Sequence, residues 1–399
     1  MRVKPVFVQV VFVATLVFAL VPCHRAQEPA QPTVKIAAWN VLNLFDNHDQ
    51  PGKLDEGTDP KSVAEKRALA QAIDALGTDV LGVEEVENRE VLEDLNRHLA
   101  RPFAFVELIE GNDPRGIDCG ILSRFPIESV TSHRLMPIGQ NLEFARDFPL
   151  FRLRLAPQLA VHVGVVHLKS KLGKKEESDA WRLAEANGIR AILDNVRLRD
   201  PNTPIVIMGD FNDTRDAATL APLFGLLADV TSVVAKNDQW TYQYQGKGEQ
   251  IDFVLASKDF AAKGAGIVHL EDSPSDHCPV WAEFKTPVPC VPVALPAGKK
   301  LAEPTRPKVD ATHLDALKKQ LLQEVHASGK VVKVHRARSG VMLNFLEDYK
   351  KALVVFIPQD ALKRFETEKG RELDALVEKT VSIQGPEGQR DGQLQLRLT

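Results

Sequence analysis

Cysteine is scarce in this chain, and its few cysteines form no recognisable pattern. Only four occur in 399 residues, and one of them, Cys23, falls in the N-terminal apolar segment. The others are Cys119, Cys278 and Cys290, an odd number without the close spacing of zinc ligands. Cys119 and Cys278 belong to apolar, strand-like stretches, so we expect buried thiols and not reactive ones. The sequence therefore predicts neither a disulfide framework nor a cysteine metal site.

Long hydrophobic runs are also rare, and the one clear example lies at the N-terminus. Residues 6–21 are apolar with two exceptions and follow Arg2 and Lys4. This pattern is typical of a secretory signal peptide, whose apolar run is shorter than the about 20 residues of a membrane-spanning helix. We expect residues 1–26 to be removed, the mature protein to be secreted or periplasmic, and no stable membrane insertion after cleavage. An uncleaved anchor is the alternative.

Neither sign of charge dominates the chain, whose formal net charge is −4. Residues 308–399 contain 16 Lys and Arg against 13 Asp and Glu, a net charge of +3, which leaves −7 for residues 1–307. The larger part is therefore not a basic nucleic-acid clamp. A hydrophobic fraction of 44% over this length suits a globular protein of two domains.

Proline marks the boundary between these domains, because residues 287–307 contain six prolines in 21 residues. That composition predicts an extended linker. We divide the mature chain into a first domain over residues 33–286, a linker over 287–310 and a second domain over 311–399. The second domain shows the pattern of a small β-barrel of the OB type, with strands expected at 330–336, 341–345 and 353–357, a helix at 360–377 and a hairpin at 380–399.

Carboxylates follow a fully apolar stretch at residues 205–213 (IVIMGDFND). Four apolar residues without polar alternation predict a strand covered on both faces, and Gly209 permits a tight turn after it. Asp210, Asn212 and Asp213 would then lie at the rim of a sheet. An Asp-x-Asn pair there can orient water and phosphate beside a divalent cation, although the same residues also form an ordinary turn.

A second stretch, residues 274–280 (PSDHCPV), places Asp276 and His277 directly before an apolar strand. With both stretches present, the chain resembles the endonuclease/exonuclease/phosphatase superfamily, whose members include pancreatic deoxyribonuclease, exonuclease III and bacterial sphingomyelinases. The opening NVLNLFD at residues 40–46 is similar to the secreted bacterial branch. The resemblance covers about residues 33–284 and implies an α/β fold, a four-layer sandwich of two packed mixed sheets flanked by helices. It also implies an enzyme, a hydrolase of phosphoester bonds that depends on Mg²⁺ or Mn²⁺.

The remaining family positions occur in order at the ends of expected strands, and the resemblance implies a role for each. His277, held by Asp252, would be the base that activates water. His167, held by Asp118, would neutralise the phosphoryl oxygens or assist the leaving group. The other implied roles are positioning of water and phosphate by Asp210 and Asn212, phosphate contacts by Arg146 and Asn40, and metal binding by Glu85, Asn40 and Asp276.

Some residues invite a structural interpretation. Glu84 stands where the family usually has glutamine, and we interpret Glu84 and Glu87 as a solvated edge. Arg146 could equally form a surface ion pair with Asp147. A helix is expected to begin at Asp59-Pro60 and end at Gly77, and another over residues 177–199 should cover the sheet without contributing to the chemistry.

Three functions compete at this stage. The first is a secreted metal-dependent nuclease that hydrolyses DNA or RNA. The second is a phosphodiesterase or phosphatase acting on lipid headgroups or small phosphoesters, which the acidic first domain suits equally well. The third is a non-catalytic binding protein that retains the fold, which is disfavoured because every catalytic position is occupied by a suitable residue.

Overall fold

The computed structural model describes most of the chain after residue 30, so the expected signal peptide lies outside the described residues. Within those that are described, no helix combines the length and apolar character needed to cross a membrane. The described ranges are 31–46, 53–54, 58, 60–139, 141–244, 246–271, 273–295, 309–313, 317, 324–337, 340–358, 362, 373–390 and 393–397.

Two mixed sheets form the first domain. Each has six strands, in the orders β13-β14-β1-β2-β4-β3 and β5-β6-β7-β8-β12-β9. The first sheet contains β1 (Thr33–Leu44), β2 (Val80–Val86), β3 (Phe105–Leu108), β4 (Asp118–Ser123), β13 (Ala262–Ile267) and β14 (Val280–Lys285). The second contains β5 (Ile127–Thr131), β6 (Leu150–Ala156), β7 (Leu159–His167), β8 (Ile205–Asp210), β9 (Ala228–Asp229) and β12 (Asp252–Ala256).

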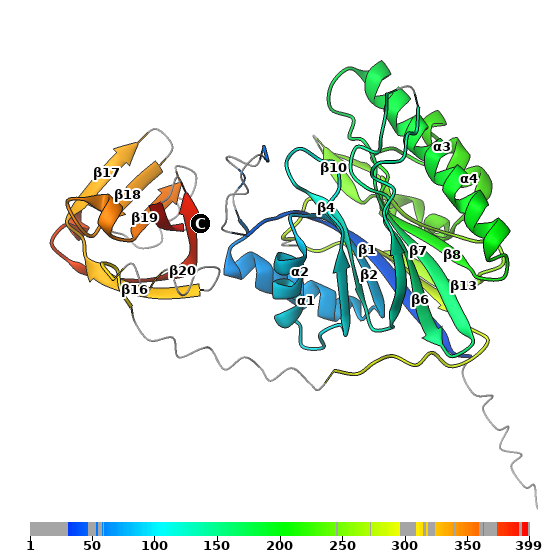
Figure 1. Ribbon diagram of the computed structural model, residues 1–399, viewed down its shortest axis with the longest axis horizontal. Coiled ribbons are helices and arrows are strands. Elements are labelled where there is room, and N and C mark those ends of the chain that lie inside the picture. Colours follow the sequence, from blue (N-terminus) through cyan, green and yellow to red (C-terminus); the bar gives the residue numbers. More distant parts are fainter. Residues whose placement is uncertain are drawn as a thin grey trace, which may run out of the picture. The chain divides into compact units, whose positions relative to one another are not determined.

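Successive side chains of the central strands pack on opposite faces of their sheet. The two sheets are therefore the inner layers of a four-layer sandwich. Along β1, Ile36 and Ala38 pack between the sheets, whereas Ala37 and Trp39 pack under helices. The helices α1 (Val63–Leu76) and α2 (Arg89–Arg97) cover the first sheet, and α3 (Lys175–Arg199) and α4 (Ala221–Leu226) cover the second (Figure 1). Both faces of each sheet are thus buried, and the predicted four-layer α/β architecture is confirmed.

The start of α1 corrects the sequence prediction. The helix begins after Ser62, whose hydroxyl accepts from the Glu65 amide while the Glu65 carboxylate accepts from the Ser62 amide. This capping box satisfies two backbone donors at once, and it outcompetes the expected start at Asp59-Pro60. The end is as predicted, because Gly77 adopts the left-handed conformation with φ 60°.

The C-terminal domain contains a seven-stranded sheet with the order β15-β16-β20-β21-β19-β18-β17. The expected OB-like barrel is not confirmed, because the described strands form an open sheet with β15 and β17 at its edges. The hairpin near the C-terminus is present, but most of the helix expected at 360–377 lies outside the described residues. The strands are β15 (Val309–Asp310), β16 (Glu324–Lys330), β17 (Lys333–Ala337), β18 (Gly340–Asn344), β19 (Val354–Pro358), β20 (Thr380–Arg390) and β21 (Gln393–Arg397).

The described beginning of the proline-rich linker is bonded to the first domain. The amides of Val291 and Val293 donate to the carbonyls of Leu155 and Arg124 at 2.7 and 2.8 Å. Residues 296–308 lie outside the described part of the chain. Cys119 and Cys278 are buried free thiols, as the sequence predicted.

Candidate active site

Parallel strand pairs in the two sheets bring their carboxyl ends to one rim. In the first sheet β1 runs parallel to β2, and in the second β7 runs parallel to β8, with His167 opposite Asp210. Asn40 at the end of the regular part of β1 bridges the sheets, since its Nδ2 lies 3.3 Å from Glu85 Oε1 and 3.3 Å from Asp210 Oδ2. The predicted residues Asn40, Glu85, His167 and Asp210 therefore meet in one cluster.

The backbone is irregular where this cluster forms. Glu85 has φ 62° and Asn212 has φ 52°, in the left-handed region that non-glycine residues rarely adopt. The pairing of β2 with β4 shifts register between Val83 and Val86, so Glu85 lies at an irregularity of its strand. Its carboxylate accepts from the Asn43 amide at 3.1 Å. Such conformations cost of order 1–3 kcal/mol each and concentrate at functional sites.

Gly209 is required by the close approach of the second sheet's strands. Its φ is 129°, and a Cβ there would lie 2.2 Å from the Val166 carbonyl oxygen. Directly after it, Asp210 Oδ1 accepts from the Asn212 amide at 2.7 Å, and Asn212 Nδ2 donates to the Leu168 carbonyl at 3.0 Å. Burial raises the pKa of Asp210 to about 7, with the positive charge of His277 opposing the rise.

His277 and Asp252 form a buried pair. Nδ1 of His277 donates to the two Asp252 oxygens at 2.9 and 3.1 Å, and its Nε2 lies 3.9 Å from Asp210 Oδ2. Burial would lower the pKa of His277, but the charges of Asp252 and Asp210 and the hydrogen bond raise it to about 10. Without a metal ion the ring is thus a proton donor.

Residues that the sequence analysis missed fix the backbone of His277. The indole Nε1 of Trp39 donates to the His277 carbonyl at 2.9 Å, and the His277 amide donates to Ser275 Oγ at 3.1 Å. Ser275 Oγ in turn donates to the Asn40 carbonyl at 2.6 Å. The loop before β14 is therefore held from β1, which also carries Asn40.

His167 is placed differently from expectation. Its Nε2 lies 3.5 Å from Asp210 Oδ2, but no hydrogen bond or ion pair joins it to Asp118 within the part of the chain that the structure describes. Asp118 is instead bonded at Oδ1 to the Gly111 amide at 2.6 Å, which turns its carboxylate toward that loop. Burial and the nearby charges of Arg146 and His277 lower the pKa of His167 well below its usual range. These effects favour the neutral form of the His167 imidazole.

Arg146 is buried, and its partner is not the one considered from the sequence. Its Nε lies 2.9 Å from Asp113 Oδ2, and its Nη1 donates to the Leu168 carbonyl at 2.9 Å. The neighbouring Asp147 instead accepts from the His133 amide. The Leu168 carbonyl thus receives both Arg146 and Asn212, which links the predicted phosphate-binding arginine to the end of β7.

The donor set fits a divalent cation. Within the described residues, Asp210, Asp252 and His277 offer ligand atoms within 4.8 Å of one another. Asp252 and His277 are committed to their mutual hydrogen bond, so the available hard oxygens are those of Asp210 and Glu85, both beside Asn40. The Asn40 amide oxygen accepts from the Leu42 amide at 3.0 Å. Carboxylate oxygens suit Mg²⁺. Asp276, also expected at the metal, is exposed at this rim.

Glu84 and Glu87 are not the solvated edge that the sequence suggested. Glu84 is fully buried, and neither of its oxygens has a hydrogen-bond partner among the described residues. A Cβ on Gly209 would come within 2.6 Å of Glu84 Oε1, so the carboxyl group fills the space that this glycine leaves between the sheets. Glu87 is also buried and accepts from the Asp46 amide. Glu84 thus belongs to a central strand covered on both faces, and Glu87, directly after that strand, is buried under the segment that carries Asp46.

Replacing Glu84 by glutamine is expected to make unfolding less dependent on pH. Burial, followed by the charges of Asp252 and Asp210, raises the pKa of Glu84 well above the usual range of a glutamate. The folded state therefore retains a proton that the unfolded chain releases, and wild-type stability falls as pH rises above about 4.5. Glu84→Gln removes this loss, so its free energy of unfolding relative to wild type should rise from pH 5 to pH 8, by up to about 1.4 kcal/mol per pH unit.

The measurement is urea unfolding at both pH values in EDTA. The matched control is Glu90→Gln, because Glu90 is exposed on α2. Parallel pH profiles for wild type and Glu84→Gln would show that Glu84 does not titrate as a buried group.

Helix α3 contributes to the site, although the sequence analysis assigned it only a covering role. The Glu185 carboxylate accepts from the Ala145 amide at 2.8 Å and from the Lys169 amide at 2.7 Å, which ties together the loops that carry Arg146 and follow His167. Arg182 Nε lies 3.2 Å from Asp213 Oδ2 in the loop after β8. The sequence did contain a signal for this role, because Arg182 and Glu185 are charged residues at buried positions on the apolar face of the helix.

Glu185→Ala is expected to lower kcat/KM for a small phosphodiester by roughly 10- to 100-fold, since it releases two loops from their common acceptor. Glu185→Gln keeps one acceptor oxygen and should recover part of the loss. Steady-state kinetics with circular dichroism as a folding check measures this. Glu176→Ala, an exposed glutamate on the same helix, should behave as wild type; equal losses in both would remove the special role of Glu185.

Comparisons with known proteins identify the family. Among solved structures, the chain is similar to truncated Caenorhabditis elegans TDP2 (16% identity, 64% of this chain and 98% of that chain, TM-score 0.47) and to Bacteroides thetaiotaomicron mannosyl-6-phosphatase (17%, 63% and 100%, 0.47). It is also similar to the human Nocturnin catalytic domain (18%, 64% and 95%, 0.46). No curated protein matches it. The model of the Endonuclease/Exonuclease/phosphatase family matches residues 35–270, more than half of the sequence, and the chain belongs to this family.

Proposed function

We propose that this protein is a secreted, metal-dependent phosphodiesterase, a nuclease that hydrolyses DNA or RNA. Family membership makes it a phosphoester hydrolase. The observation that supports phosphodiester cleavage best is the buried Asp252–His277 pair, whose free Nε2 lies 3.9 Å from Asp210. A histidine oriented by a carboxylate and facing a water-positioning carboxylate is the arrangement that activates water.

The other side chains divide the remaining tasks. Asp210 and Asn212 position the attacking water, and Asn40 and Arg146 contact the phosphate with donor groups. His167, a neutral imidazole, donates a hydrogen bond to a phosphoryl oxygen or to the leaving oxygen. Glu185 and Arg182 hold the loops around these residues in position.

Mg²⁺ or Mn²⁺ would be held by Glu85 and Asp210, with Asn40 and Asp276 nearby. A bound divalent cation supplies positive charge for the phosphoryl oxygens and offsets the carboxylates that now keep His277 protonated. The chain's own contribution is orientation, because Glu85, Asp210 and Asn40 each accept from a backbone amide.

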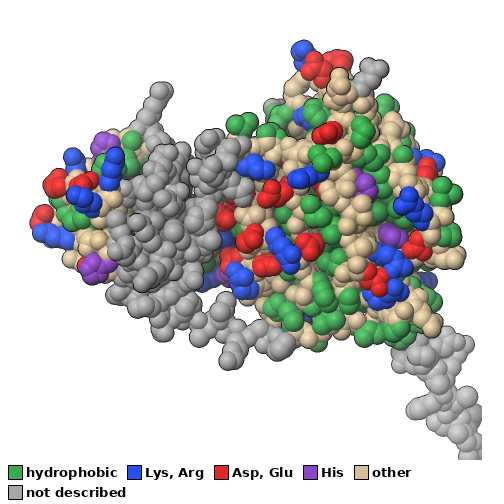
Figure 2. Space-filling view, in the orientation of Figure 1, with side chains coloured by type: hydrophobic (Ala, Val, Ile, Leu, Met, Phe, Trp, Pro, Cys, Tyr) green, Lys and Arg blue, Asp and Glu red, His purple; other side chains and the backbone are tan. Residues whose placement is uncertain are grey.

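The domain and localisation predictions complete the proposal. Residues 1–26 would be a cleaved signal peptide, 33–286 the catalytic domain, 287–310 the linker and 311–399 an accessory domain that binds nucleic acid. On the face drawn in Figure 2, Lys and Arg side chains are interspersed with Asp and Glu. The described residues on that face form no continuous basic surface, so recognition would rest on a few residues around the scissile phosphate.

Substrate class can be tested directly. Purified protein is incubated with plasmid, single-stranded DNA, RNA and sphingomyelin, each with Mg²⁺ and with EDTA. Metal-dependent loss of a nucleic acid supports the nuclease. Hydrolysis of sphingomyelin alone would favour the second candidate, a lipid-headgroup phosphodiesterase, and no hydrolysis of any substrate would favour a binding protein. The fully occupied set of catalytic positions argues against that last outcome.

A further inference from the structure

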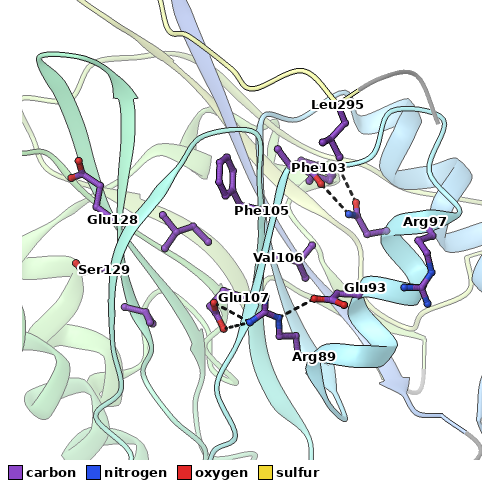
Figure 3. A pocket seen from close by; sticks show the side chains of 14 residues that line it. Arg89, Glu93, Arg97, Phe103, Phe105, Val106, Glu107, Glu128, Ser129 and Leu295 are labelled. Atoms are coloured by element: carbon purple, nitrogen blue, oxygen red, sulfur yellow. Dashed lines mark hydrogen bonds and ion pairs between the residues drawn. The ribbon is translucent and has the colours of Figure 1, made fainter.

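Several hollows on the described residues of the first domain are large enough for a ligand, and two of them differ in what they offer it. The hollow drawn in Figure 3, of about 590 Å³, lies between the edge strands β3 and β5. Its charged residues are already paired with protein groups: Arg89 with Glu93 and Glu107, and Glu128 with Arg154. It contains none of the candidate active-site residues.

The other hollow adjoins the active site. It is a groove of about 850 Å³, within the size range of small-molecule sites. Its walls are the loop before β4, the loop before β6, the loop after β7 and the start of α3, and Glu185 ties the second and third of these loops together. Arg146 lines the groove, and its Nη1 donates to the Leu168 carbonyl, which also accepts from Asn212. The groove therefore adjoins the residues proposed to hold the scissile phosphate.

The lining of the groove is cationic on balance. Arg115, Arg146 and Lys169 line it, against Asp113 and Glu143. Asp113 neutralises part of this charge, since it pairs with Arg115 at 3.3 Å and with Arg146 at 2.9 Å. One net positive charge remains, which suits an anionic ester and not a neutral ligand.

The groove also contains a fixed aromatic ring. Trp181 donates its only polar hydrogen, on Nε1, to the Glu143 carbonyl at 2.9 Å. The indole is thereby oriented and has no remaining donor for a ligand. Leu142 and Leu172 also line the groove, and Leu172 is 80% exposed. An apolar side chain exposed to this degree in a groove is available to cover a ligand.

We propose that this groove binds the nucleoside attached to the scissile phosphate, with the base against Trp181. The inference rests on the proposed function and specifies its substrate. A planar base matches a ring that offers only its π-surface, and base–aromatic stacking is sequence-tolerant. The phosphate attached to this nucleoside matches the net positive charge of the groove lining. A sugar phosphate would leave Trp181 and Leu172 uncovered, whereas an alkyl phosphate would gain nothing from a planar ring over another apolar side chain.

Equilibrium binding separates these ligands without requiring turnover. The protein in EDTA is titrated calorimetrically with thymidine 5′-monophosphate, hexyl phosphate and inorganic phosphate. The nucleotide is expected to bind roughly 5- to 100-fold more tightly than inorganic phosphate, which corresponds to one stacking interaction. Trp181→Leu, which keeps apolar bulk, should remove this advantage, and Trp181→Phe should retain most of it.

The matched control is Leu198→Ala on the same helix, an exposed apolar residue outside the groove, which should leave all three affinities unchanged. Hexyl phosphate binding as tightly as the nucleotide, or an undiminished nucleotide advantage in Trp181→Leu, would overturn the proposal. The proposed function fails separately, if wild type with Mg²⁺ hydrolyses no phosphodiester while the Trp181-dependent nucleotide binding persists.

Discussion

His277→Ala is expected to lower kcat for phosphodiester hydrolysis by about 10²- to 10⁴-fold, the usual cost of losing a general base. His277 is the one imidazole in the candidate site that is hydrogen bonded to a carboxylate, at 2.9 Å from Asp252 Oδ2. The lost side chain lies at the rim of the sheets, so the fold should persist. The measurement is kcat at saturating Mg²⁺ with circular dichroism as a check on folding.

A histidine elsewhere in the second sheet provides the control. His162 on β7 is also paired with an aspartate, since its Nε2 lies 3.2 Å from Asp200 Oδ2, but it lies within the strand, which begins at Leu159 and ends at His167. His162→Ala should retain wild-type kcat. Asp252→Asn should lose most of the activity, because the amide cannot stabilise the imidazolium. If His277→Ala turns over at the wild-type rate with matched metal, the base must be another residue.

The second large effect is expected at Glu85. Glu85→Gln should raise the Mg²⁺ concentration needed for half-maximal activity by at least about 10-fold, because it removes a negative charge from the proposed cation site. Wild-type activity should disappear in EDTA and return with Mg²⁺ or Mn²⁺. Metal titrations of activity for wild type and variant measure the difference.

Glu84→Gln is the informative comparison for this experiment. Both variants remove one carboxylate from consecutive residues, but Glu84 fills the space between the sheets while Glu85 accepts from Asn43 at the rim. The shift in the titration should therefore be much smaller for Glu84→Gln. Equal shifts would mean that the cation responds to total charge and not to a ligand at Glu85.

The sequence predicted the convergence of the site well, because chemistry-bearing residues at the ends of apolar strands meet wherever those strands run parallel. This reasoning placed Asn40, His167 and Asp210 at one rim. It failed for Glu84, since a charged residue normally indicates solvent. The structure buries this one in a central strand, and the backbone irregularity at Glu85 cannot be read from residue types.

Contacts between loops, and the closure of a sheet, could not be predicted from the sequence for a different reason. The expected Asp118–His167 pair depends on the direction of a carboxylate, and the Gly111 amide holds Asp118 Oδ1 at 2.6 Å. The C-terminal barrel was inferred from the number and order of strands. Closure depends on which edges pair, and the described sheet leaves β15 and β17 unpaired with each other.

The hydrogen bonds that hold His277 also determine when the site can form during synthesis. Trp39 and His277 are separated by 238 positions, and Asn40 and Ser275 by 235. A chain still emerging from the ribosome contains Asn40, Glu85 and His167 long before the loop that carries His277, the proposed base. Hydrolytic activity therefore cannot appear until almost the entire first domain has been made, so incomplete chains that end before β14 would pose no threat to phosphodiesters in the cell that makes them.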